Sequence, residues 1–184
     1  MRKNQKGFSL IELLIVVAII LIIAAIAIPN LLRSRMAANE ASAVGSLRTI
    51  LTANVTYNST YNMGFASTLA MLGSGGAAVP PAVASCNASE LLDAVLSNAT
   101  VVTAPKSGYW FKYAGATAFT GTVPAGCTAG WLTFDAAALP AIPGTTGQRS
   151  FCIDQTGVIM DDPTGAIVAA GGASCAVDGY PNTL

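Results

Sequence analysis

The longest apolar run of the sequence lies close to the amino terminus. No residue from Leu13 to Leu32 carries a charge, so 20 consecutive positions are uncharged and mostly apolar. A helix of that length extends about 30 Å at the standard rise, which matches the hydrocarbon core of a bilayer. The pattern predicts a helix that crosses a membrane once.

The helical pattern continues beyond Pro29, which lacks an amide hydrogen and therefore bends or loosens a helix that contains it. Residues 31–57 are rich in Ala, Leu, Arg and Glu, with Gly45 as a weak point. Apolar residues recur there at helical spacings, at Val44, Leu47, Leu51 and Val55. Glu40 and Arg48 fall near the same side. We therefore expect this half to contact its own head on one side and other chains on another.

The pattern changes after Tyr61. Gly73–Gly76 and Val79–Pro81 indicate a flexible connection, and Ser67–Leu72 is long enough for one helical turn. Asn87–Glu90 has the spacing of a capping box and predicts the start of a short helix. The inner face of that helix is expected to consist of Leu91, Leu92, Val95 and Leu96.

Four short segments then have strand patterns. Tyr109–Tyr113 alternates and places three aromatic side chains on one face. The other candidates are residues 130–135, 149–154 and 157–160, with a turn at 155–157 between the last two. Their order favours an antiparallel meander packed on the second half of the long helix. The predicted fold class is α+β, a long amino-terminal helix with a carboxy-terminal antiparallel sheet.

Charge modifies the interpretation of the apolar run. Arg2, Lys3 and Lys6 precede it, which predicts a cytoplasmic amino terminus and export of the remainder. Glu12 lies inside the apolar stretch, where a carboxylate costs about 2.5–3.5 kcal/mol at the membrane centre and less near an edge. Such a charge usually indicates a function.

Three fates of this segment compete. It is an uncleaved single-span anchor, a signal peptide cleaved at Ala25-Ile26-Ala27, or a helix retained after cleavage between Gly7 and Phe8. Neither an anchor nor a disposable signal has a use for Glu12. The carboxylate therefore favours cleavage before the apolar run.

The segment Lys6–Leu13, KGFSLIEL, resembles the processing motif of type IV prepilins and of the related pseudopilins of type II secretion. The resemblance implies that a prepilin peptidase cleaves after Gly7 and N-methylates Phe8. It also implies that Glu12 pairs with the Phe8 amino group of a neighbouring subunit during assembly, and that Pro29 occupies the helix-kinking position of the family.

The resemblance also implies a domain organisation and a function. Residues 1–7 would be the leader, 8–60 the long helix with 8–30 in the membrane or the filament core, and 61–184 the globular head of a pilin fold. We expect an inner-membrane precursor, amino terminus in the cytoplasm, that polymerises into a type IV pilus at the cell surface. The implied partners are the peptidase, an assembly ATPase and a platform protein. The alternatives are a type II secretion pseudopilin and a membrane-anchored exported domain that does not polymerise.

Four cysteines follow the apolar run, with spacings that contain no C-x-x-C pair. Export favours two disulfides over a zinc or redox site. We favour Cys152–Cys175, which would close the carboxy-terminal segment onto the sheet, together with Cys86–Cys127. The other two pairings stay open, and the family resemblance agrees with a carboxy-terminal disulfide loop.

Catalysis and nucleic-acid binding find little support in the sequence. The chain contains no histidine, no phosphate-binding loop and no nucleophile elbow, and we expect no cofactor and no metal. After the leader the net charge is −3, which does not favour phosphate contacts. Asp154, Asp161 and Asp162 do not match a calcium loop and are expected to be solvated turn carboxylates. The Asn-x-Ser/Thr triplets are expected as chance matches, at Asn54, Asn58, Asn87 and Asn98.

Overall fold

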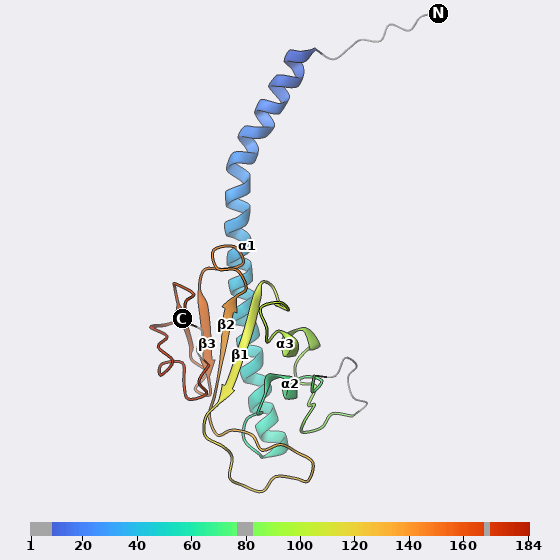
Figure 1. The fold of residues 1–184 in the computed structure, drawn as a ribbon, viewed down its shortest axis with the longest axis vertical. Coiled ribbons are helices and arrows are strands. Elements are labelled where there is room, and N and C mark those ends of the chain that lie inside the picture. Colours follow the sequence, from blue (N-terminus) through green and yellow to red (C-terminus); the bar gives the residue numbers. More distant parts are fainter. Residues whose placement is uncertain (1–8, 77–82, 168–169) are drawn as a thin grey trace, which may run out of the picture. The chain divides into compact units, whose positions relative to one another are not determined.

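The computed structural model describes residues 9–76, 83–167 and 170–184. The connection expected at Val79–Pro81 lies outside these residues. These described residues form three helices and one five-stranded sheet, which confirms the α+β class (Figure 1). In chain order the elements are α1 (Leu10–Tyr61), α2 (Leu69–Leu72), α3 (Ala94–Asn98), β1 (Tyr109–Gly115), β2 (Phe134–Pro140), β3 (Ser150–Asp154), β4 (Ile159–Asp162) and β5 (Asn182–Thr183).

The helix α1 belongs to two compact units, Met1–Arg35 and Met36–Leu184. Its buried residues all lie in the second unit, where they make one face: Ala43, Ser46, Leu47, Ile50, Ala53, Asn54 and Tyr57. The apolar spacing used for the prediction selected only part of this face, because Val55 is 54% exposed and Leu51 is half-buried. Small residues contribute much of the true face, since they allow the sheet to approach closely.

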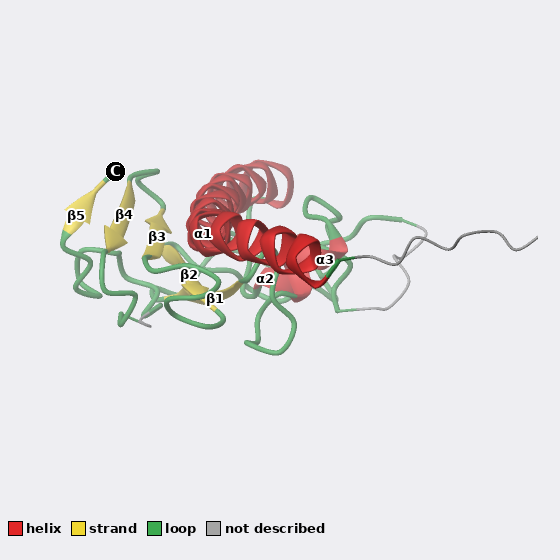
Figure 2. Ribbon diagram, turned by 90° about the horizontal axis from the view of Figure 1, so that it is seen from above, coloured by secondary structure: helices red, strands yellow, loops and turns green. Residues whose placement is uncertain are grey.

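The sheet is an antiparallel meander in the order β1-β2-β3-β4-β5 (Figure 2). One face packs on the second half of α1. There Leu47 and Ile50 share a core with strand residues that include Phe111, Phe151 and Ile153. Side chains alternate between the two faces of a strand, so Phe111 and Tyr113 point inward while Trp110 points outward.

The outer face of the sheet is covered as well. Residues 170–180, which we call the C-terminal loop, pack there in a second apolar cluster. The cluster joins Ala137, Leu139 and Cys152 of the sheet to Ala170, Cys175 and Tyr180 of the loop. Because both faces are covered, every residue of β2 is buried.

The strand β2 corrects the prediction of a strand at 130–135. The strand begins at Phe134 and runs through Ala136, Ala137 and Ala138, which are fully buried. Alanine is depleted in strands, so the sequence pattern missed this run. Trp131 instead makes isolated bridges to Phe65 and Ala118. The two-residue strand β5 was also not predicted.

The start of α3 is a second correction. The helix begins at Ala94, and Asp93 caps it by accepting a hydrogen bond from the Leu96 amide at 2.9 Å. The expected start at Asn87–Glu90 is wrong, because that segment bonds to the α2 region: Ser89 donates to the Met71 carbonyl at 2.9 Å. Val95 is consequently 62% exposed instead of facing the core.

Candidate assembly and processing site

The first part of α1 presents an uninterrupted apolar surface. Large apolar side chains from Leu10 to Leu32 are 45–76% exposed within the chain. In the described part of the chain, α1 is the one helix that is long and apolar enough to cross a membrane. Apolar surface of this extent requires lipid or another protein as its partner.

Glu12 lies at the third helical position of α1, and its carboxylate has a partner within the chain. The Ser9 amide donates to Oε2 of Glu12 at 3.0 Å, and the Ser9 carbonyl accepts from the Leu13 amide at 3.3 Å. This is one half of a capping box, in which a carboxylate satisfies a helix N-terminal amide and interacts favourably with the helix dipole. The Ser-x-x-Glu spacing at Ser9–Glu12 is the signal that would have predicted it.

Gly7 and Phe8 lie outside the described residues. Cleavage after Gly7, methylation of Phe8 and its pairing with Glu12 therefore stay predictions from the sequence. Pro29 lies inside α1, which continues through it. Without an amide hydrogen, Pro29 leaves the Ala25 carbonyl without its usual helical donor.

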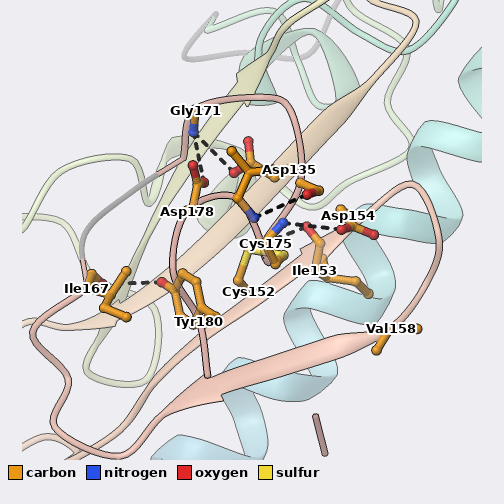
Figure 3. The surroundings of a disulfide bond; sticks show 12 residues. Asp135, Cys152, Ile153, Asp154, Val158, Ile167, Gly171, Cys175, Asp178 and Tyr180 are labelled. Atoms are coloured by element: carbon orange, nitrogen blue, oxygen red, sulfur yellow. Dashed lines mark hydrogen bonds between the residues drawn. A yellow bond between two sulfur atoms is a disulfide. The ribbon is translucent and has the colours of Figure 1, made fainter. Parts of the chain in front are cut away.

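All four cysteines form disulfides, in the pairs favoured from the sequence. Cys86 and Cys127 link two loops of the head across 41 residues. Cys152 of β3 and Cys175 of the C-terminal loop are linked across 23 residues, and both are fully buried (Figure 3). The second disulfide joins the loop covalently to the outer face of the sheet.

An ion-pair network that the sequence did not reveal connects α1 to the sheet. Glu40 of α1 accepts from Arg149 at 2.9 Å and from the Gln148 amide at 3.0 Å, while Arg149 also lies 3.6 Å from Asp161. Burial acts to raise the pKa of Glu40, but the bonds from Gln148 and Arg149 outweigh it, so its pKa is below the ordinary value. Glu40 and Arg149 are 109 residues apart in the chain, which hides their relation from sequence patterns.

A buried polar contact reinforces the same connection. The Tyr113 hydroxyl of β1 lies 2.9 Å from Oδ1 of Asn54 and 2.8 Å from the Ala66 carbonyl. The Ala66 amide donates to the same Asn54 oxygen at 3.2 Å. Asn54 is fully buried, so its Asn-x-Ser/Thr triplet is not accessible to a glycosylating enzyme in this fold.

The three clustered aspartates are not solvated, which corrects the expectation from the sequence. Asp154, Asp161 and Asp162 are only 4–6% exposed. Backbone amides of their own turns satisfy Asp154 and Asp162, for example Thr156 at 2.9 Å and Thr164 at 3.0 Å. Within the described residues no three acidic, histidine or cysteine side chains converge as metal ligands.

Comparisons with known proteins match a limited part of the chain. The family model described as the prokaryotic N-terminal methylation motif matches residues 2–28. The type IV wide pilus major component PilA4 of Thermus thermophilus is 66% identical over 38 residues, which is 21% of this chain and 29% of that protein. The type IV major pilin protein PilA of Myxococcus xanthus is 44% identical over 54 residues, 29% of this chain and 24% of that protein. No solved structure matches.

The methylation motif and the two relatives support the resemblance to type IV pilins. The chain aligns with less than a third of the length of these curated relatives, so most of it has no counterpart in the alignments. Both relatives are named as pilus components, which is a structural role and not a catalytic one. A leader motif together with an apolar helix fits a membrane-anchored precursor and an assembled surface pilus.

Proposed function

Starting from an amino-terminal segment that has the type IV pilin methylation motif, we propose that this chain is a structural subunit of a type IV pilus. Identical subunits would polymerise through the first part of α1, in a head-to-tail contact that does not close and so builds a helical filament. The observation that carries the proposal is a carboxylate, Glu12, inside an apolar helix surface that the chain itself does not bury.

The apolar surface fits both a membrane-stored and an assembled state. In the bilayer it would contact lipid, and in the filament it would contact the same surface of other copies. Transfer between two apolar environments changes the hydrophobic free energy little. Extraction would therefore require external work, for which an assembly ATPase and a platform protein are the proposed partners.

Glu12 would set the register of each incoming subunit. In the single chain its carboxylate bonds to the Ser9 amide, a neutral donor. A charged amine on Phe8 of a neighbouring subunit would be a stronger partner, because charge-assisted hydrogen bonds are stronger and an ion in an apolar medium is stabilised mainly by an opposite charge. This step requires that a peptidase first cleaves after Gly7 and frees the Phe8 amine.

A pseudopilin of type II secretion is the second candidate, because its leader motif is of the same kind. Two features of the head favour the pilus over the pseudopilus. The head has two disulfides, and its described residues contain no cluster of metal ligands. Adhesion, motility and DNA uptake are the roles that such a filament would serve. The net charge of −3 after the leader gives no electrostatic support to DNA binding.

The mass and amino-terminal sequence of the mature protein test the processing step. We expect the protein to begin at N-methylated Phe8. An intact Met1, or a start at Ile28 after cleavage of an ordinary signal peptide, would contradict the proposal. Electron microscopy of material sheared from cells would then distinguish long pili from short pseudopili.

The variant Glu12→Ala tests the register. We expect processed subunits to accumulate in the membrane with few or no filaments, because each subunit lacks its pairing group. Glu90→Ala is the matched control, since Glu90 is an exposed carboxylate of the head, and it should assemble normally. Filaments of Glu12→Ala that match the wild type in number and length would refute the role of Glu12.

A further inference from the structure

Two carboxyl groups hold the C-terminal loop on the outer face of the sheet. Asp135 of β2 is fully buried and accepts hydrogen bonds from the amides of Gly171, at 3.2 Å, and Gly172. Asp178 of the loop accepts from the same Gly171 amide at 3.0 Å. Figure 3 shows both hydrogen bonds as dashed lines from the Gly171 nitrogen to the Asp135 and Asp178 carboxyl groups.

The neighbouring charged and titratable groups on this face have interaction partners of their own. Asp154 of β3 accepts from the Cys175 amide at 3.2 Å, and Asp162 of β4 accepts from the amides of its own turn. Tyr180 donates its hydroxyl hydrogen to the Ile167 carbonyl at 3.2 Å. Lys112 of β1 lies on the same face by register, opposite Ala137, and is exposed and has its own interaction.

The shared donor and the full burial of Asp135 make it costly to ionise Asp135 beside the Asp178 carboxyl. Burial is the main cause that raises the pKa of Asp135, to about 7, and the hydrogen bond and charge of Asp178 act in the same direction. The amides of Gly172 and Gly171 act against this rise. Asp135 therefore retains its proton up to about neutral pH.

We propose that a proton on Asp135, donated in a hydrogen bond to Asp178, holds the C-terminal loop on the sheet in a pH-dependent way. With the proton present, Asp135 donates to Asp178 and both carboxyls hold the Gly171 amide. When the proton leaves, the buried Asp135 carries a negative charge beside the partly exposed Asp178, and the stretch from Gly171 to Asp178 separates from β2. Cys175 limits the opening, because its disulfide keeps the loop attached to β3.

The direction of the pH effect follows from linkage. The unfolded chain releases the Asp135 proton near pH 3.8, whereas the folded chain retains it until about pH 7. The stabilisation is therefore complete below pH 3.8 and is lost as the pH rises through about 7. This device acts within a single subunit and does not depend on polymerisation.

Hydrogen–deuterium exchange of the full chain in detergent micelles tests whether the attachment of the C-terminal loop depends on pH. After correction for the intrinsic pH dependence of exchange, we expect amides of residues 170–178 to lose at least tenfold protection between pH 5.5 and pH 8.5. Asp178→Asn removes one charge and supplies an amide donor to Asp135, so its protection should differ less between the two pH values than that of the wild type. A wild-type loop with equal protection at both pH values, or an Asp178→Asn loop with the wild-type difference, would overturn the proposal.

Two further samples separate the pair from general charge effects. Asp135→Asn should abolish the difference in loop protection between the two pH values, because the side-chain amide of the variant would donate to Asp178 at every pH. Glu90→Gln removes an exposed carboxylate and should retain the wild-type difference in protection between the two pH values. Loss of that difference in Glu90→Gln would overturn the proposal. Infrared spectra of wild-type protein with ¹³C-labelled aspartate need no variant. A band of a protonated carboxyl at pH 6 that disappears by pH 8.5 is expected, and the absence of this band at pH 6 would contradict a protonated Asp135.

Discussion

The two halves of α1 have similar local structure but different partners. The first half, to Arg35, consists mostly of large apolar residues, and the chain leaves these side chains exposed. The second half mixes alanine, serine and asparagine with a few large residues, and one face of it is buried. Helix formation is thus common to both halves, whereas burial is provided by the chain for one half only.

The two halves of α1 therefore contribute differently to the stability of the head. The second half stabilises the head, because Leu47 and Ile50 are in its core. The first half contributes little to the free energy of unfolding of the head, because its apolar side chains stay exposed within the chain. Each glutamate of the helix follows the same division: Glu40 forms an ion pair with Arg149, whereas Glu12 accepts a hydrogen bond from the Ser9 amide.

The largest expected effect comes from truncating the buried half. Leu47→Ala removes a fully buried side chain and should lower the free energy of unfolding of the head by about 2–5 kcal/mol. Leu21→Ala, at a position 63% exposed in the first half, should leave that free energy unchanged. Denaturant titration followed by tryptophan fluorescence of the head measures both. Equal losses in the two variants would contradict the division.

Removal of a disulfide should come next. The double variant Cys152→Ser with Cys175→Ser removes the disulfide between two cysteines 23 positions apart. It should lower the free energy of unfolding of the head by about 2–4 kcal/mol. In the wild type, the buried pair should resist mild reductant longer than Cys86–Cys127, since Cys127 is only half-buried. Thiol labelling with mass spectrometry gives the order of reduction, and faster reduction of Cys152–Cys175 would show that the C-terminal loop does not shield it.

The paired glutamate should have a smaller effect. Glu40→Gln removes the charge that Arg149 binds and should destabilise the head by about 1–3 kcal/mol. Because the pKa of Glu40 is lowered from its ordinary value of 4.5, its stabilisation is complete above that pH and is lost as the pH falls below it. Thermal melts of wild type and variant should therefore converge in acid. Glu12→Gln is the matched control and should leave the melting temperature of the head unchanged.

The smallest effect is expected at Val55, an apolar residue of the second half that the head leaves 54% exposed. Val55→Thr keeps the β-branched shape and should change the free energy of unfolding of the subunit by less than about 0.5 kcal/mol. A larger loss in the isolated subunit would mean that this face of α1 has a partner within the chain. An effect confined to assembled material would identify it as a contact between subunits.

The sequence predicted the features that depend on local pattern. The long helix, the meander and the strand at Tyr109–Tyr113 follow from periodicity, and the fold class is confirmed. It failed where tertiary contact decides. The alanines of β2 form a strand because both faces of the sheet are covered, and Asp93 caps α3 because Asn87–Glu90 is bound to the α2 region.

The functional residues also differ in whether the sequence alone could identify them. Glu12 is conspicuous because its charge violates the local apolar pattern, so a single sequence was sufficient to select it. The pairs Glu40–Arg149 and Asp135–Asp178 consist of ordinary residues in ordinary surroundings along the chain. Only the fold brings them together, and no spacing rule connects residues 109 positions apart.

The Cys152–Cys175 disulfide has a consequence for cleavage of the chain by a protease. A protease that cuts the chain at any exposed bond between these two cysteines produces two fragments, but the disulfide keeps them in one molecule. Tyr180 and the apolar cluster beneath it would still hold the carboxy-terminal fragment on the sheet. A nicked subunit would thus keep its shape within a filament, where a damaged copy cannot be replaced individually.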